Sequence, residues 1–316
     1  MRSAAAVRSR KTRRLRPYFK SALYSIVGTM AVALLNLMLL FNRKLIADFS
    51  GFVMRKIGPW LQEHRVGRNN LKAAFPEKSP EEIEQILAGT WDNLGRVAAE
   101  SVHLDRIRIG HPDEPGSGDV MYDRKDLLHL AKPTIFFVAH LANWEISAMF
   151  APNFGFASYV LYRPFSIPAT NDAILKLRAR CMGTLVPAGL DAPIRLAEAL
   201  KKGAHVGMLV DQHFNKDFRG GRGRGVDVSF FGRPCKANPL LAHLAQLSNC
   251  DIRGTRIIRL RDRNTFRSEM TDVLDVPRRA DGKIDIQGTM QAVTSVIEGW
   301  IREYPEQWLW LHRRWR

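Results

Sequence analysis

One stretch of the sequence reads Thr134-Ile-Phe-Phe-Val-Ala-His140-Leu-Ala-Asn-Trp-Glu145. Residues 134–138 are apolar or β-branched, a pattern typical of a short strand that is buried on both faces. Asn143 is a good N-cap, so the sequence predicts a helix that begins at Trp144. We therefore expect His140 in a turn between a strand and a helix, where open α/β sheets bind their ligands.

His140 and Glu145 are the candidate catalytic residues of this turn. An imidazole here can accept a proton from a hydroxyl, and we expect Glu145 to hold the ring through its other nitrogen. Both residues also have structural explanations. A histidine at a strand end is often a satisfied structural residue, and the helix macrodipole favours a glutamate in the first turn. The spacing alone therefore leaves catalysis and structure open as alternatives.

Composition limits the classes of protein that fit the chain. Its 316 residues, 46% of them hydrophobic, suffice for one large α/β domain or two small ones. The net charge of +17 favours an anionic partner, which is a nucleic acid, an anionic membrane surface or a phosphorylated substrate. Cys181, Cys235 and Cys250 show no paired spacing, so we expect neither a disulfide framework nor a cysteine zinc site, as in a reducing compartment.

The N-terminus divides into two segments before the main domain. Residues 1–20 are strongly basic and contain no acid, and residues 21–42 carry no charge. The apolar run 22–41 would form a helix about 30 Å long, which matches the hydrocarbon core of a bilayer. We therefore predict a retained membrane helix over 21–42, with a buried core helix as the alternative. The basic residues before this run would place the N-terminus in the cytoplasm and the main domain outside. The free cysteines favour a main domain in the cytoplasm, so the orientation of the helix stays open.

Residues 43–316 are predicted to form one domain. Strands and helices alternate between 134 and 210, which favours a mostly parallel central sheet with flanking helices. Arg163, Asp211 and Gln212 directly follow predicted strands, so we expect them on the same rim as His140. Arg163 suits a phosphate, a carboxylate or a surface salt bridge. Asp211 either shapes the site or is a turn residue.

The sequence lacks the motifs of a metal site, a serine hydrolase and a nucleotide-binding loop. The other histidines show no metal-ligand spacing, and no G-x-S-x-G element is present. The Gly/Arg-rich residues 219–225 form neither a Walker motif nor a dinucleotide fingerprint, and we predict a basic loop there. The C-terminal residues 308–315, rich in tryptophan and arginine, predict either a membrane-interface belt or a packed tail. We expect no metal and no cofactor.

Seven features of the chain occur in an order that a known family shares. They are the basic N-terminus with one apolar segment, Asn70-Leu71 with Ala74-Phe75-Pro76, His140-x4-Glu145, Tyr162-Arg163-Pro164, Asp211-Gln212, Phe230-Phe-Gly-Arg233-Pro234, and Pro305-Glu-Gln-Trp-Leu-Trp-Leu-His-Arg-Arg-Trp315. Over nearly its whole length the chain resembles the late (lauroyl/myristoyl) acyltransferases of lipid A biosynthesis. The central motif alone is weak, whereas the ordered set is specific.

The resemblance implies a glycerolipid-acyltransferase-like fold and the transfer of a fatty acyl group from acyl carrier protein. The acceptor is a hydroxyl of a lipid A precursor, a phosphorylated and acylated glucosamine disaccharide. His140 would be the general base and Glu145 its partner, since the family motif ends in Asp or Glu. The substrate-binding residues would be Arg163, Asp211, Gln212 and Arg233. The family also implies the bacterial inner membrane, with the catalytic domain on its cytoplasmic face.

Two rival functions remain. One is an acyltransferase that acts on another glycolipid or glycerolipid. The other is a membrane-anchored nucleic-acid-binding protein that uses the positive charge and the Gly/Arg loop, although no nucleic-acid-binding fold signature accompanies them. We expect no nucleic acid partner. The acyl chain length and the acylated hydroxyl do not follow from the sequence.

Overall fold

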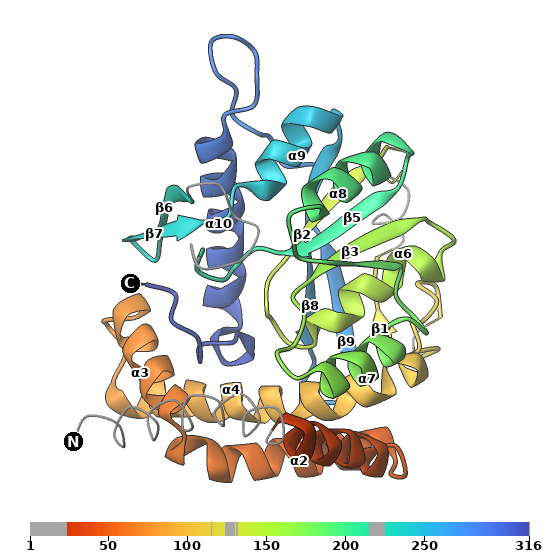
Figure 1. The fold of residues 1–316 in the computed structure, drawn as a ribbon. Coiled ribbons are helices and arrows are strands. Elements are labelled where there is room, and N and C mark those ends of the chain that lie inside the picture. The colour runs from red at the N-terminus through yellow and green to blue at the C-terminus, as the bar shows by residue number, and fades with distance from the viewer. Residues whose placement is uncertain (1–23, 115, 124–129, 131, 215–224, 316) are drawn as a thin grey trace, which may run out of the picture.

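A seven-stranded sheet forms the centre of the computed structural model, which describes residues 24–114, 116–123, 130, 132–214 and 225–315 (Figure 1). The strand order is β1-β9-β8-β2-β5-β3-β4, and neighbours pair in parallel except β8 with β9. The strands are β1 Val120–Met121, β2 Thr134–Val138, β3 Ser158–Tyr162, β4 Thr184–Pro187, β5 His205–Leu209, β8 Asp251–Arg259 and β9 Phe266–Met270. The predicted α/β class with a mostly parallel sheet is confirmed.

β2, the strand that leads to His140, is the central strand of the sheet. β2 pairs with β5 on one side and with β8 on the other. Ile135 and Phe137 are fully buried on one face of β2. They pack with helices α8 Ala192–Lys201, α9 Leu240–Ser248 and α10 Ile286–Glu303, which cover that face. On the opposite face Thr134 and Val138 are buried and Phe136 is partly exposed, so most of β2 is buried, as its unbroken apolar sequence predicts.

The opposite face of the sheet is covered by shorter elements. These are the 3-10 helix η3 Trp144–Met149 and the helices α6 Phe150–Asn153 and α7 Pro168–Arg178. Three further helices lie along one end of the sheet, where Figure 1 shows them in orange and red: α2 Arg43–Ile57, α3 Gln62–Ala74 and α4 Pro80–Glu100. A capping box of Ser79 and Glu82 begins α4. Short 3-10 helices complete the set: η1 Gly58–Trp60, η2 Ser101–Arg106 and η4 Pro305–Gln307.

The prediction of a membrane helix over residues 21–42 is wrong. Residues 24–38 are helical, but the chain then turns, and Asn42 caps α2 by accepting a hydrogen bond of 2.9 Å from the Lys44 amide. The described helical residues 24–38 extend for about 22 Å, short of the roughly 30 Å that a bilayer core requires. Within the described ranges, no helix is both long and apolar enough to span a membrane. The basic segment 1–20 lies outside the described residues.

The strands that follow β5 in the sequence do not join the central sheet directly. β6 Val226–Phe230 pairs antiparallel with β7 Arg233–Ala237 in a separate two-stranded sheet beside α10. Most of the predicted basic loop 219–225 lies outside the described residues. The C-terminal residues pack into the protein: Trp308 and Trp310 are fully buried. Of the two alternatives for this segment, the packed tail is therefore confirmed.

Candidate active site

His140 lies just beyond the end of β2, where Asp211 holds it at two points. The His140 backbone amide donates to Asp211 Oδ2 at 2.9 Å, and His140 Nδ1 lies 2.8 Å from Oδ1 of the same carboxylate. A ring nitrogen that faces a carboxylate carries the proton, which leaves Nε2 as the hydrogen-bond acceptor. The His140 side chain is 12% exposed and lines a cavity, so Nε2 is accessible from that cavity.

Asp211 follows β5 and is held by a third donor. Trp308 Nε1 donates to its Oδ2 at 2.7 Å, and the carboxylate is fully buried. Burial alone would raise the pKa of Asp211, but the charge of His140 and its hydrogen bonds lower that pKa well below its usual range. The carboxylate therefore stays ionised and can stabilise a proton on His140.

A second imidazole lies close to this pair but stays neutral. His312 Nδ1 lies 2.7 Å from the Leu309 carbonyl, and its ring contacts Trp308 at a centroid distance of 5.2 Å. Burial lowers the pKa of His312 to about 4. At neutral pH, His312 thus adds no charge beside Asp211. The sequence did not predict that Trp308 and His312 lie beside Asp211. Both are far from β5 along the chain, and no sequence motif relates the two segments.

Glu145 has a different partner from the predicted one. It lies in η3, where Asn143 Oδ1 accepts a hydrogen bond of 3.2 Å from its amide, as expected of an N-cap. Its carboxylate accepts two hydrogen bonds from Arg178 of α7, at 2.8 and 2.5 Å. The structure therefore places Asp211, and not Glu145, at His140 Nδ1. Both Glu145 and Arg178 line the same cavity as His140.

The turn after His140 has a conformation that requires support. Ala142 has a φ of 46°, in the left-handed region that non-glycine residues rarely adopt. Its amide donates to the Gln307 carbonyl at 2.9 Å, and its own carbonyl accepts from Asn93 Nδ2 at 3.1 Å. Contacts from α4 and from the C-terminal region thus fix the backbone between His140 and Glu145.

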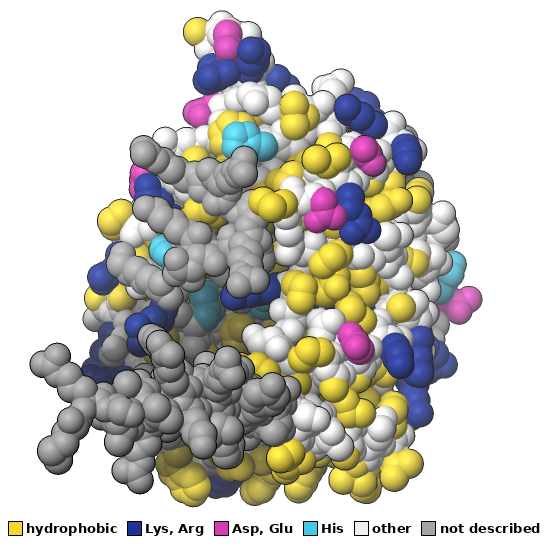
Figure 2. Space-filling view, viewed as in Figure 1, with side chains coloured by type: hydrophobic (Ala, Val, Ile, Leu, Met, Phe, Trp, Pro, Cys, Tyr) yellow, Lys and Arg dark blue, Asp and Glu magenta, His cyan; other side chains and the backbone are white. Residues whose placement is uncertain are grey.

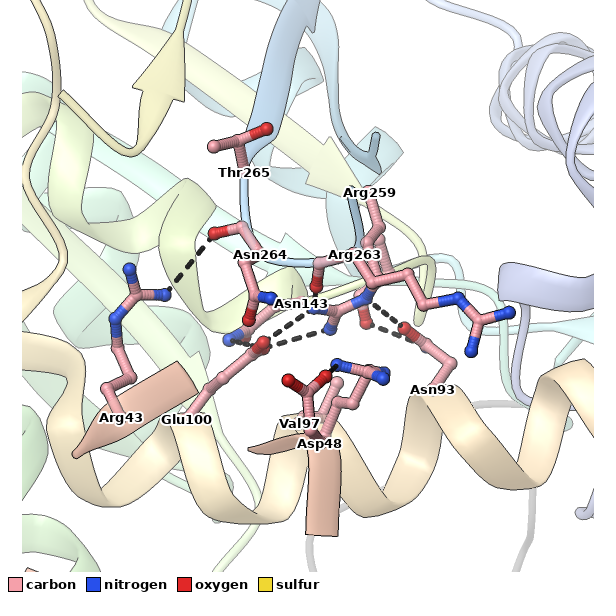
Figure 3. Close-up of polar contacts among 12 residues, drawn as sticks. Arg43, Asp48, Asn93, Val97, Glu100, Asn143, Arg259, Arg263, Asn264 and Thr265 are labelled. Atoms are coloured by element: carbon pink, nitrogen blue, oxygen red, sulfur yellow. Dashed lines mark hydrogen bonds and ion pairs between the residues drawn. The ribbon is translucent and has the colours of Figure 1, made fainter. Parts of the chain in front are cut away.

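A buried ion pair fixes the next residue of the turn, as Figure 3 shows. Asn143 Nδ2 donates to Glu100 Oε2 at 2.9 Å. Glu100 is fully buried and accepts from Arg259 of β8 through both oxygens, at 2.5 and 2.9 Å. Arg259 Nε also donates to Asn93 Oδ1 at 3.0 Å. Bidentate pairing with additional hydrogen bonds is the geometry in which a buried ion pair offsets its desolvation.

The cavity beside His140 has a volume of about 840 Å³ and a mainly apolar lining. It lies over the sheet face opposite to α8, α9 and α10, and residues of several strands line it. They include Phe136 and Val138 of β2, Val160 of β3 and Gly207 of β5. Such a cavity suits a long apolar ligand whose reactive end lies at His140.

Of the other predicted site residues, two line this cavity and one lies in the hairpin of β6 and β7. Gln212 and the exposed Arg163 line the cavity, and Gln212 Nε2 lies 3.4 Å from His140 Nε2. Arg233 begins β7 in the separate hairpin and is not part of the lining. As for metals, the described part of the chain contains no group of three or more His, Cys, Asp or Glu residues that could hold an ion.

Comparison with protein-family models identifies the family of the chain. A family model described as bacterial lipid A biosynthesis acyltransferase matches residues 16–316. A search of the curated proteins finds no match.

Proposed function

The chain belongs to the bacterial lipid A biosynthesis acyltransferase family, and we propose that it transfers a fatty acyl group from acyl carrier protein to a hydroxyl of a lipid A precursor. The precursor would be a phosphorylated and acylated glucosamine disaccharide. One observation carries this proposal: His140 presents Nε2 to a large apolar cavity while Asp211 holds its other nitrogen. This arrangement suits a general base beside a bound acyl chain.

In the proposed reaction His140 acts directly on the acceptor. Nε2 takes the proton of the hydroxyl while that oxygen attacks the thioester carbonyl, which gives a tetrahedral intermediate. The intermediate then collapses, the carbon–sulfur bond breaks, and His140 returns the proton to the thiolate of the carrier. Asp211 stabilises the imidazolium between these steps, as a carboxylate does in a catalytic triad. The thioester is already activated, so the proposal needs no covalent enzyme intermediate.

Charge supports both proposed substrates. The acceptor carries phosphates, and an exposed guanidinium such as that of Arg163 at the cavity suits them. The net charge of +17 would favour encounter with an acidic carrier protein. Glu145 would take part by holding the guanidinium of Arg178 at the cavity wall.

The proposal is tested with the purified protein and an acyl carrier thioester. We expect mass spectrometry to show one added acyl group on a phosphorylated, acylated glucosamine disaccharide and none on glycerol 3-phosphate. The control omits the protein. Acylation of glycerol 3-phosphate alone would replace lipid A with a glycerolipid acceptor, and absence of transfer to both acceptors would contradict the proposed donor.

We also propose that the protein docks on the inner membrane from the cytoplasmic side without α2 crossing it. Leu45, Phe49 and Phe52 are 68%, 63% and 50% exposed, and their spacing places them on one face of α2. Figure 2 shows hydrophobic side chains along the lower edge of the molecule, where Figure 1 places α2. The exposed Lys44 and Lys56 flank this face. Apolar residues flanked by cations are typical of helices that lie in the surface of an anionic bilayer.

Exchange of Leu45, Phe49 and Phe52 for serine should reduce binding to vesicles that contain anionic lipid at least tenfold. Each large apolar side chain transferred from water contributes up to about 1.5–3 kcal/mol, so partial insertion of three suffices. Cosedimentation with vesicles measures the effect. The matched control exchanges Leu190 and Ile194 for serine, since they are 68% and 63% exposed. Leu190 precedes α8 and Ile194 lies within it, and α8 is at the other end of the molecule from α2 (Figure 1). Unchanged binding of the triple variant would mean that α2 is not the docking surface.

A further inference from the structure

Gly207 lies in the middle of β5, where a glycine weakens the strand. It has no side chain to pack, and it loses more conformational freedom on folding than any other residue. Glycines inside strands often mark a bulge, or a place where other atoms or a ligand approach the backbone closely. Gly254 of β8 is an example of close approach, because a Cβ there would lie 2.6 Å from Phe137 and 2.7 Å from Trp300. Packing therefore explains the glycine at position 254.

Gly207 has no such explanation within the fold. It pairs in regular register with Phe136 of β2 and with Val160 of β3, so there is no bulge at this position. Its backbone does not lie in the left-handed region that favours glycine. A Cβ added to Gly207 would meet no atom of the described residues within 4 Å. Close approach of a ligand to the backbone is therefore the explanation that remains.

Gly207 also forms the floor of a groove inside the cavity. Gly207, Phe136 and Val160 all line the cavity, and the two side chains flank the glycine because their strands lie on either side of β5. Neighbouring strands are about 4.8 Å apart, so the Cα atoms of Phe136 and Val160 are roughly 10 Å apart across the glycine. Side chains fill part of this width. The groove that remains suits one unbranched alkyl chain in contact with the backbone of Gly207.

The position of Gly207 along the cavity suits the chain of the acyl donor. Asp211, which holds His140, lies four residues beyond Gly207, a distance of roughly 13 Å along an extended backbone. An alkyl chain that advances about 1.2 Å per bond, as an extended backbone does, covers this distance with about 11 carbons. The lining continues past Gly207 to His205 and Phe156, so a longer chain has space beyond it.

From the open position of Gly207 in this groove, we infer that the acyl chain of the donor crosses β5 over Gly207. Residue 207 then determines whether the protein accepts chains longer than about 11 carbons, the length that reaches it from His140. This inference rests on the proposed function, because that function places the thioester at His140.

A glycine that serves a ligand differs from a structural glycine in the effect of its replacement on stability. Gly207→Ala should raise the Tm by about 1–3 °C, because alanine loses less conformational freedom on folding and meets no neighbour. The same methyl group narrows the groove. With a tetradecanoyl carrier thioester, kcat/KM should therefore fall about fourfold, the effect of withdrawing one methylene from an apolar site. A lower Tm in Gly207→Ala would make the glycine structural and overturn the inference.

The main test compares octanoyl and tetradecanoyl carrier thioesters. In Gly207→Val, the ratio of kcat/KM for the tetradecanoyl donor to that for the octanoyl donor should fall at least tenfold, since withdrawal of two methylenes suffices. The matched control is Gly299→Val. Gly299 is exposed on α10, does not line the cavity, and has no described atom within 4 Å of an added Cβ. This control should keep the wild-type ratio, and an unchanged ratio in Gly207→Val would overturn the inference.

A binding measurement separates this inference from the proposed function. Displacement of a fluorescent fatty acid needs neither carrier nor acceptor. Gly207→Val should weaken the binding of tetradecanoic acid at least tenfold and leave that of octanoic acid unchanged. This result without any acyl transfer by the wild-type protein would refute the proposed function and leave the groove as a binding site for a long acyl chain. Equal weakening of both acids, or a change only in the KM of the acceptor, would overturn the inference.

Discussion

Replacing His140 with alanine should leave the protein folded and reduce kcat for acyl transfer by roughly 10²–10⁴-fold, the usual contribution of a general base. An unaided hydroxyl is a poor nucleophile, and His140 Nε2 is the acceptor that the structure presents at the cavity. The side chain lies at the cavity wall and not in the packed core, so its removal creates no internal void. Circular dichroism measures the fold, and turnover of the carrier thioester measures the rate.

The control for this variant is His243→Ala, because His243 is exposed on α9 and does not line the cavity. It should keep wild-type turnover. A folded His140→Ala protein with wild-type kcat would remove His140 as the base and with it the proposed mechanism.

Asp211→Asn should reduce kcat by up to about 10⁴-fold with little change in KM, as the equivalent exchange does in a serine-protease triad. The side chain keeps its shape, but its amide can donate to His140 Nδ1. The ring then carries its proton on Nε2 and cannot accept another from the acceptor. Steady-state kinetics with the carrier thioester separate the two parameters.

Glu145→Gln is the matched control, since it makes the same exchange at the other carboxylate. It retains an oxygen that accepts from Arg178, so we expect a loss of less than about tenfold. A greater loss in Glu145→Gln than in Asp211→Asn would reverse the roles that the hydrogen bonds assign to the two residues.

The lowered pKa of Asp211 also predicts how its contribution to stability depends on pH. A carboxyl whose pKa is lower in the folded state stabilises the fold above its unfolded pKa of about 3.9, and that stabilisation is lost as the pH falls toward the folded value. The free energy of unfolding of the wild-type protein should therefore approach that of Asp211→Asn in acid. Urea denaturation between about pH 5 and pH 2 measures this difference.

The sequence predicted the position of the site better than its internal contacts. The rule that parallel strands end on one rim brought Asp211 and Gln212 to His140 across 71 and 72 residues. The partner of Glu145 was not predictable, because it depends on the left-handed turn at Ala142 and on Arg178, a residue of another element. Local periodicity carries no information about such a contact.

The N-terminal error has a similar origin. Residues 21–42 are uncharged, and composition alone does not distinguish a membrane helix from a shorter helix that ends at a turn. At the turn, the Asn42 side chain caps α2 by accepting a hydrogen bond from the Lys44 amide. A polar residue at the end of an apolar run is also common in true membrane helices, so the sequence offered no signal for the difference.

Three contacts that support the site come from residues 307–309, far along the chain from His140. Trp308 donates to Asp211, Gln307 accepts from Ala142, and the Leu309 amide donates to the His140 carbonyl at 3.1 Å. Residues 307–309 are synthesised after His140 and Asp211, so a nascent chain can contain both site residues and still lack the groups that hold them. The orientation of the His140 ring therefore depends on docking of residues 307–309 as well as on assembly of β2 and β5.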